Sequence, residues 1–420
     1  MQDHEKQSKA NIILIAGLLF NLTIGVLYAW SVIKKKLIAD IDLGGWGWTS
    51  TEAGLPYTVA IGCFSIGLLV GGKIQDKIGP RWVVTTGGAF VGLGLFFAGF
   101  LGGADNVPAV VMSFGILTGL GLGLGYGCVS PPAYKWFHPS KKGIVSGLIV
   151  GGFGIAALIY SPLATYLLNS VGIAQTFMTL GAGVFIISTL LAQLIKNPPP
   201  GYVPPQPVGA AAQAAAAAAA TPVDMTSGEV MRTKRFWLMF VVFLISASIG
   251  LMIIGNITKI AEIQIVGLGP AIFAILVSFL AITNTFGRVL GGLMSDKIGR
   301  VNALFVVTML QMLNMVGFYF YQSIPALCVG IVLVGFCYGT LLSVFPALTA
   351  DLFGLTNLGS NYGILFLAWG LSGVGAPLMA DYIYDTTGAF TTAYIICACM
   401  LVVAAFANFL LKKDVDALLK

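Results

Sequence analysis

Twelve long apolar stretches constrain the fold of this chain more than any other feature of its sequence. Each is long enough to cross the hydrocarbon core of a bilayer, about 30 Å, as an α-helix. They occupy approximately residues 11–33, 51–71, 82–101, 108–131, 143–168, 174–195, 235–258, 270–293, 301–321, 325–350, 361–383 and 389–411. Strands are excluded because period-2 alternation is absent and a segment in lipid must satisfy its own backbone hydrogen bonds. The sequence therefore predicts an all-α membrane protein with twelve transmembrane helices.

The composition and the distribution of charge agree with this interpretation. Hydrophobic residues make up 57% of the chain, charged residues make up 9%, and the mean hydropathy is +0.93. Most of the 22 Lys and Arg residues fall on one side of the membrane if both termini are cytoplasmic, and cytoplasmic loops retain positive charge. We therefore expect a multi-pass protein of the cell inner (plasma) membrane with both termini in the cytoplasm. The net charge of +6 is explained by this topology, so no nucleic-acid partner is expected.

A segment rich in proline and alanine divides the chain in the middle. This segment, residues 196–234, has the composition of a cytoplasmic linker. We expect an N-terminal six-helix half at residues 1–195 and a C-terminal six-helix half at residues 235–420.

The loop between the second and third stretch of each half is repeated in sequence. GGKIQDKIGPR, which ends at Arg81, recurs as GGLMSDKIGR, which ends at Arg300. Two parallel repeats with a substrate site at their interface near the membrane midplane are typical of a rocking transporter. A simpler alternative is that the charged residues of each copy form only a solvated turn.

The doubled loop resembles the cytoplasmic loop signature of the major facilitator superfamily, and the order of elements matches over the whole chain. The resemblance implies the fold of that superfamily, with two six-helix halves. It also implies that the charged residues of the loop make contacts between helices that stabilise one conformation. The candidate gating residues are Asp76, Lys77, Arg81, Asp296, Lys297 and Arg300.

One cation lies inside an apolar stretch, which is a costly position. Arg288 is embedded in LAITNTFGRVLGG, where a permanent charge costs roughly 3 kcal/mol on insertion scales. No acidic residue within the stretches is an obvious permanent partner, so a substrate carboxylate is a candidate anion. Asn284, one turn earlier on the same face, is expected to assist by donating to the same carboxylate or to a substrate hydroxyl. Alternatively, Arg288 extends inward toward Asp296, about 12 Å along the helix.

Two tyrosines occupy comparable places in the two halves. Tyr126 lies in GLGYGCVSPP of the fourth stretch, and Tyr338 lies in GFCYGTLLSVFP of the tenth. Both are candidates to direct a hydroxyl toward a small, partly apolar ligand in a central cavity. Packing within the bundle is the alternative explanation for each of them. Tyr28 in VLYAWSV is a further candidate of the same kind.

Glycines recur at helical spacing in the fourth stretch. Small residues let transmembrane helices approach closely, because lipid provides no hydrophobic driving force between helices. We expect close helix packing at Gly115, Gly119, Gly123 and Gly127.

Several motifs resemble one branch of the superfamily, the branch that contains monocarboxylate transporters and oxalate/formate-type antiporters. These motifs are LYAWSV, GWGWTSTE, NTFGRVLGGLMSDKIGR and NYGILFLAWG. The resemblance implies that Arg288 binds the substrate carboxylate. Trp369 stands where oxalate-type antiporters carry a lysine, so the second cation expected for a dicarboxylate is missing. Asn284 stands where mammalian monocarboxylate transporters carry an acidic residue implicated in proton coupling, and Val32 replaces their first-helix lysine.

The expected function is secondary active transport of a small monocarboxylate of the lactate or pyruvate type, by alternating access and coupled to protons. Arg288 and Asn284 would bind the carboxylate, with Tyr28, Tyr126 and Tyr338 on the polar side, and the surroundings of Trp369 would receive the apolar end. The alternative is a proton-independent carboxylate exchanger of the oxalate/formate type. An enzyme is not expected, because HExxH, paired-carboxylate and nucleophile motifs are absent. No cofactor or metal is expected, and the repeat disfavours a channel.

Overall fold

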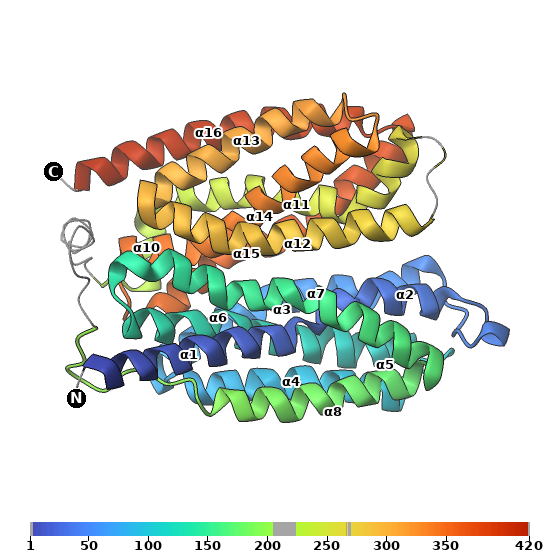
Figure 1. The fold of residues 1–420 in the computed structure, drawn as a ribbon, viewed down its shortest axis with the longest axis horizontal. Coiled ribbons are helices and arrows are strands. Elements are labelled where there is room, and N and C mark those ends of the chain that lie inside the picture. The colour runs from blue at the N-terminus through green and yellow to red at the C-terminus, as the bar shows by residue number, and fades with distance from the viewer. Residues whose placement is uncertain (1–2, 205–223, 266, 268–269, 419–420) are drawn as a thin grey trace. The chain divides into compact units, whose positions relative to one another are not determined.

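The computed structural model describes residues 3–204, 224–265, 267 and 270–418, and helices form most of these residues (Figure 1). Twelve helical segments in these ranges are long and apolar enough to cross a membrane. The described residues form no β-strand. Each helical segment corresponds to one of the twelve predicted stretches. The prediction of an all-α membrane protein is therefore confirmed. The alanine tract of the predicted linker lies in residues 205–223, outside the described ranges.

The helices that make up the spans have the following bounds. In the N-terminal part they are α1 (Asp3–Ile24), a 3₁₀ helix (Gly25–Ala29), α2 (Trp30–Ile38), α3 (Ser50–Ile78), α4 (Pro80–Leu101), α5 (Val107–Val110), a π-helix (Val111–Thr118), α6 (Gly119–Trp136), α7 (Lys142–Ser170) and α8 (Gly172–Ala192). In the C-terminal part they are α11 (Lys234–Gln264), α12 (Pro270–Ile298), α13 (Arg300–Phe318), α14 (Ile324–Phe353), α15 (Leu358–Thr387) and α16 (Thr391–Leu418). Short helices occur at Ile41–Leu43, Pro139–Lys141 and Ser227–Arg232, the last of which is α10.

The chain divides into two compact units by its internal contacts. Unit 1 comprises residues 1–137, 152–205 and 355–367. Within it α4 packs against α6 and α8, and α3 packs against α6. Unit 2 comprises residues 138–151, 206–354 and 368–420.

Within unit 2, α12 packs against α14, and α13 lies beside α16 (Figure 1). Because α7 is divided at Gly151 and α15 at Leu367, each unit contains helices from both ends of the sequence. The predicted halves, 1–195 and 235–420, are a division of the sequence and remain a prediction.

The glycines of the fourth stretch pack against α3, within unit 1. A Cβ at Gly123 would overlap the backbone carbonyl oxygen of Phe64, and one at Gly119 would lie 2.7 Å from that of Ala60. Gly115 and Gly127 face Val59 and the Leu68 side chain in the same way. The stripe therefore permits backbone contact between two membrane-spanning helices, as the sequence predicts.

The repeated DKIG sequence builds the same turn twice. Gly79 and Gly299 have φ angles of 86° and 89°, which only glycine adopts without strain. Each glycine ends one helix, α3 or α12, and the next helix starts at the following residue. The sequence repeat is therefore a structural repeat of a helix end followed directly by a helix start.

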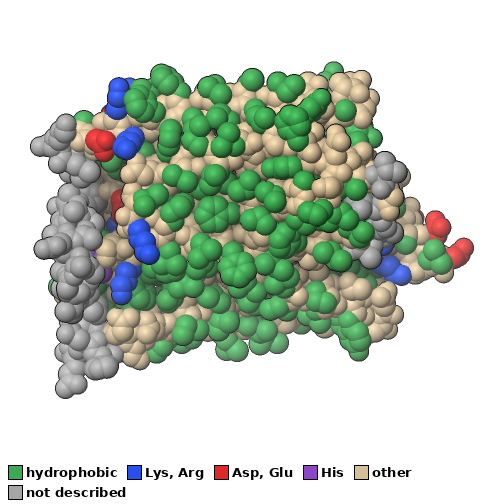
Figure 2. Space-filling view, turned by 45° about the horizontal axis from the view of Figure 1, so that its top comes forward, with side chains coloured by type: hydrophobic (Ala, Val, Ile, Leu, Met, Phe, Trp, Pro, Cys, Tyr) green, Lys and Arg blue, Asp and Glu red, His purple; other side chains and the backbone are tan. Residues whose placement is uncertain are grey.

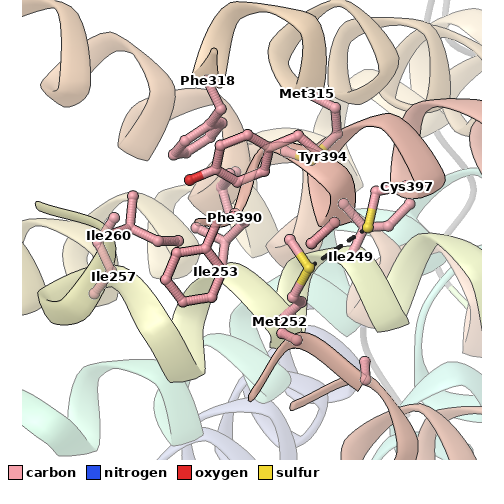
Figure 3. Close-up of a cluster of buried hydrophobic side chains, with 14 of the residues drawn as sticks. Ile249, Met252, Ile253, Ile257, Ile260, Met315, Phe318, Phe390, Tyr394 and Cys397 are labelled. Atoms are coloured by element: carbon pink, nitrogen blue, oxygen red, sulfur yellow. Dashed lines mark hydrogen bonds between the residues drawn. The ribbon is translucent and has the colours of Figure 1, made fainter. Parts of the chain in front are cut away.

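The core of unit 2 contains a large apolar cluster to which α11, α12, α13, α14, α15 and α16 all contribute (Figure 3). Phe318, Phe390 and Tyr394 lie on one side of it, and Ile253 and Ile257 belong to α11. Two sulfur atoms meet here, with the Cys397 thiol 3.5 Å from the Met252 thioether. This cluster fixes the packing of the helices of unit 2 against one another.

Hydrophobic side chains also cover much of the outer surface. On the face drawn in Figure 2, green apolar side chains fill the middle, and Lys, Arg, Asp and Glu side chains lie toward the two ends. A soluble protein rarely exposes an apolar area of this extent. The distribution agrees with a surface that contacts lipid between two aqueous interfaces.

Replacing Gly123 by alanine tests the backbone contact between α6 and α3. The new methyl group would overlap backbone atoms of Phe64 and Leu68, which cannot move aside as a flexible side chain can. We expect a loss of about 2 kcal/mol in stability and a lower melting temperature in detergent. Gly183→Ala is the matched control, because a Cβ there meets nothing within 4 Å. Equal melting temperatures of the two variants would contradict the packing argument.

Candidate functional site

Arg288 is completely enclosed on α12, with only 1% of its surface exposed. Its Nε donates a hydrogen bond of 3.1 Å to Oδ1 of Asn284, one turn earlier on the same helix. Its Nη1 donates a bond of 2.6 Å to the backbone carbonyl of Val150 on α7. Asn284 therefore accepts a hydrogen bond from the arginine through the oxygen of its amide. The side chain is thus oriented by two neutral acceptors on two different helices.

The carbonyl of Val150 is accessible because α7 approaches α12 closely. A Cβ at Gly147 would overlap the backbone carbonyl of Arg288, and one at Gly151 would lie 3.5 Å from the Val289 side chain. At Gly143, farther toward the start of α7, a Cβ would overlap the carbonyl of Gly292. Glycines at intervals of four residues therefore bring the two backbones together and place a carbonyl next to the guanidinium.

Tyr338 and Trp369 form a second polar contact in unit 2. The indole N–H of Trp369 donates a hydrogen bond of 2.7 Å to the hydroxyl of Tyr338, and both side chains are buried. The ring of Tyr338 packs against Gly250 of α11, where a Cβ would lie 2.5 Å from the ring. The next residue, Gly339, packs against the backbone of α12 at Asn284, next to the arginine.

Tyr28 and Tyr126 lie in an aromatic cluster of unit 1. Both contact the ring of Phe153, with centroid separations of 5.4 Å and 5.2 Å and edge-on geometry. Phe64 and Phe366 also pack against Tyr126, at 5.4 Å and 6.1 Å. Tyr28 belongs to the 3₁₀ segment Gly25–Ala29, where the helix of the first span changes its winding. The rings of these two tyrosines therefore pack within the aromatic cluster, and each ring also carries a polar hydroxyl group.

The aspartates of the two repeated loops play the same structural role. Asp76 accepts hydrogen bonds from the backbone N–H of Gly359 and Ser360 and from the Ser360 hydroxyl, at 3.1, 2.7 and 2.6 Å. Asp296 accepts from the backbone N–H of Gly143 and Ile144, at 2.9 and 2.8 Å. Each carboxylate thus binds the N-terminal turn of another helix, α15 or α7, where the helix dipole favours negative charge.

The second loop carries an additional network of ion pairs. Arg300 pairs with Asp296 and also, through Nε at 3.0 Å, with Asp351 of α14. Asp351 in turn accepts from the ammonium group of Lys142 at 2.7 Å. Sequence reasoning did not predict that Lys142 and Asp351 belong to this network, because they are 209 positions apart. The network links α7, α12, α13 and α14.

In the first loop the arginine is displaced by one residue and has a different partner, while the charge of Lys135 acts on Asp76. Pro80 follows Gly79, so Arg81 is the second residue of α4, whereas Arg300 is the first residue of α13. One position turns a side chain by about 100° around a helix. Arg81 accordingly donates to the side chain of Gln193, at 2.7 Å, after the end of α8. The remaining gating candidates, Lys77 and Lys297, are exposed.

His138 lies in the turn that leads into α7. Its Nδ1 accepts a hydrogen bond from the backbone N–H of Ser140 at 3.3 Å, which requires an unprotonated nitrogen. Burial lowers the pKa of the imidazole, and the neighbouring charges of Lys141 and Lys142 lower this pKa further. The side chain is therefore neutral near pH 7 and serves as a cap for this turn.

The structure as a whole defines a multi-pass membrane protein with a repeated, charge-stabilised loop and an enclosed cation within one span. The sequence profile of the Major Facilitator Superfamily matches residues 11–324 and 264–418. The chain therefore belongs to the Major Facilitator Superfamily of transporters.

Similar proteins include both uncharacterised and named transporters. YhjX of Escherichia coli (strain K12), an uncharacterised MFS-type transporter, is 31% identical, and the match covers 86% of this chain and 85% of that protein. The oxalate:formate antiporter of Oxalobacter formigenes is 27% identical, with coverages of 96% and 91%. Monocarboxylate transporter 13 of Rattus norvegicus is 26% identical, with coverages of 90% and 83%. The structure of the proton:xylose symporter XylE superposes with a TM-score of 0.68 at 16% identity, covering 96% of this chain and 95% of that one, and this likeness shows the fold.

Neutralising the two loop aspartates tests their roles. Asp76→Asn removes a charged acceptor at a helix N-terminus, and we expect a loss of about 1 to 2 kcal/mol in stability. Asp296→Asn also breaks the pair with Arg300, so we expect a larger loss of about 3 kcal/mol. Melting temperatures in detergent provide the measurement. Lys77→Gln and Lys297→Gln serve as controls and should change stability by less than about 0.5 kcal/mol. Aspartate variants that melt like these controls would contradict the assigned role.

Proposed function

We propose that the protein is a secondary active transporter of small monocarboxylates of the lactate or pyruvate type, working by alternating access and coupled to protons. The observation that carries the proposal is the enclosed guanidinium of Arg288 in a membrane-spanning helix, oriented by Asn284 and by the Val150 carbonyl. The similarity to an oxalate:formate antiporter and to a monocarboxylate transporter supports a carboxylate as the substrate class.

Carboxylate binding would change the hydrogen bonds of Arg288. A guanidinium binds a carboxylate through two parallel charge-assisted hydrogen bonds, which are stronger than a bond to a neutral carbonyl. A substrate carboxylate therefore competes with the carbonyl of Val150 for the guanidinium donors. Loss of the bond to Val150 weakens the attachment of α7 to α12. In this way, occupancy of the site would favour separation of two helices that are held together without substrate.

A single carboxylate fits the site better than two. Trp369 occupies the position where a second cation would bind a dicarboxylate, and it donates its N–H to Tyr338. This pair supplies a neutral, mostly apolar surface with a polar tip, which suits the small apolar end of lactate or pyruvate. Tyr28 and Tyr126 are proposed as further substrate contacts.

The loop aspartates would form contacts between helices that break and form again during the transport cycle. Asp76 holds α3 to the start of α15, and Asp296 holds α12 to the start of α7. Both contacts join a helix of one predicted half to a helix of the other. Alternating access requires such contacts to break and to form again, so their strength sets the balance between conformations.

We propose that the protein lies in the inner membrane of the cell, with the side that carries most of the Lys and Arg residues facing the cytoplasm.

The residue at position 284 favours a second candidate function, proton-independent exchange of carboxylates. An acidic side chain at this position would offer a proton-carrying group, and this chain has the amide of Asn284 instead. A proton-independent exchanger of the oxalate/formate type would need no such group. The two functions predict different responses to a proton gradient.

Uptake of labelled lactate into proteoliposomes tests the role of Arg288. We expect Arg288→Gln to reduce uptake roughly 100-fold, because it removes the charge that binds the carboxylate. Arg288→Lys should recover only part of this loss, since an ammonium group cannot form the bidentate contact. Arg235→Gln, the same change on α11, should leave uptake unchanged. Uptake by Arg288→Gln at the wild-type level would overturn the assignment.

A proton gradient distinguishes symport from exchange. For a proton symporter, an inward proton gradient should accelerate lactate uptake into vesicles that contain no internal substrate. An exchanger should show little uptake under these conditions and should respond to internal carboxylate instead. The measurement is the initial rate with and without the gradient, and a protonophore should abolish the difference. Absence of any gradient effect would favour the exchanger.

A further inference from the structure

A groove at one end of unit 1 lies beside the first residues of α1 and the segment that follows α8. Its volume is about 390 Å³. Ile12, Ile13, Trp136 and Leu194 provide apolar walls, and Lys9 and Lys196 also line the groove. Nothing in the proposed transport function uses these residues.

The walls of the groove are held by specific contacts. The indole N–H of Trp136, at the end of α6, donates a hydrogen bond of 2.7 Å to the carbonyl of Lys196. The hydroxyl of Tyr202 donates to the carbonyl of Trp136 at 3.2 Å, and the two rings meet edge-on at 4.8 Å. The segment after α8 is therefore folded back against α6, and the backbone of Lys196 is fixed.

The groove lies at the boundary between apolar and aqueous surroundings. It contains residues from the start of the span Gln7–Ile38 and residues that directly follow the span Gly172–Ala192. The side chains of Ile12 and Leu194 are 47% and 44% exposed, so they offer apolar surface at the membrane edge. Tryptophan is typical of this depth, where an apolar ring and a polar N–H meet different surroundings.

An anionic phospholipid matches both parts of this groove. A phospholipid brings an acyl chain for the apolar walls and a phosphate for the lysines. Two ammonium groups at one site favour a headgroup with net negative charge over a zwitterionic one, because each nearby Lys adds attraction for anionic lipid. A free soluble anion would gain nothing from Ile12, Ile13 and Leu194.

We propose that this groove binds one anionic phospholipid of the surrounding bilayer, with its phosphate between Lys9 and Lys196 and an acyl chain along Ile12 and Leu194. The lipid would join the start of α1 to the segment after α8. This site is separate from the proposed substrate site, and it stands even if the transported substrate is not a carboxylate.

Native mass spectrometry of the full-length protein in detergent tests this proposal. The probes are phosphatidylglycerol and phosphatidylcholine with identical acyl chains. We expect tighter binding of the first lipid to the wild type and a loss of about five-fold in its affinity for each lysine replaced in Lys9→Gln/Lys196→Gln. Phosphatidylcholine binding should not change. The matched control is Lys412→Gln/Lys413→Gln, which removes two exposed charges from α16.

Fluorescence quenching locates the lipid in the same preparation. Phosphatidylglycerol with brominated acyl chains should quench Trp136, measured as the difference between wild type and Trp136→Phe. The proposal is overturned if both double-lysine variants lose affinity equally, since the attraction would then be general. It is also overturned if the protein has no preference for phosphatidylglycerol, or if excess inorganic phosphate displaces the bound lipid. Melting temperatures verify that the variants are folded.

Discussion

The need to bring helix backbones together in lipid underlies the polar contact at Arg288. Lipid supplies no hydrophobic force between helices, so association depends on close packing and on hydrogen bonds. Glycines provide the approach, at Gly123 against α3 and at Gly147 against α12. At Gly147, the close approach of α7 to α12 also brings the carbonyl of Val150 within 2.6 Å of the Arg288 guanidinium. The same glycines therefore allow both the packing of the two helices and this hydrogen bond.

The two copies of the repeated loop have the same turn but make different side-chain contacts. Both copies end a helix at a glycine with positive φ, and both aspartates bind a helix N-terminus. The copies then diverge because one contains an extra residue, Pro80. Arg300 joins Asp296 and Asp351 in an ion-pair network, while Arg81 turns toward α8. Both aspartates therefore bind backbone N–H groups of another helix, but the arginine that follows each of them has different partners.

Local patterns predicted the parts of this structure that depend on nearby residues. Length and hydropathy identified the twelve spans, and spacing identified Asn284 as a neighbour of Arg288. The direction of that contact was not predictable, since an amide can donate or accept. The partners Val150 and Asp351 also escaped prediction: a backbone carbonyl carries no sequence signal, and an ion pair across 209 positions depends on the assembled fold. The hydrogen bond between Trp369 and Tyr338 also depends on the assembled fold and was not predictable from the sequence.

The two enclosed arginines of unit 2 illustrate how partners determine what a charge can do. Arg300 makes its contacts with two carboxylates, so its charge is matched within the network and the group serves structure. The contacts of Arg288 with Asn284 and with Val150 involve neutral oxygens, which orient the guanidinium. Neutral acceptors can be exchanged for a carboxylate with a gain in electrostatic energy, whereas replacing an existing carboxylate by another brings little. This difference supports the proposal that Arg288 binds a transient anion, whereas Arg300 holds helices together.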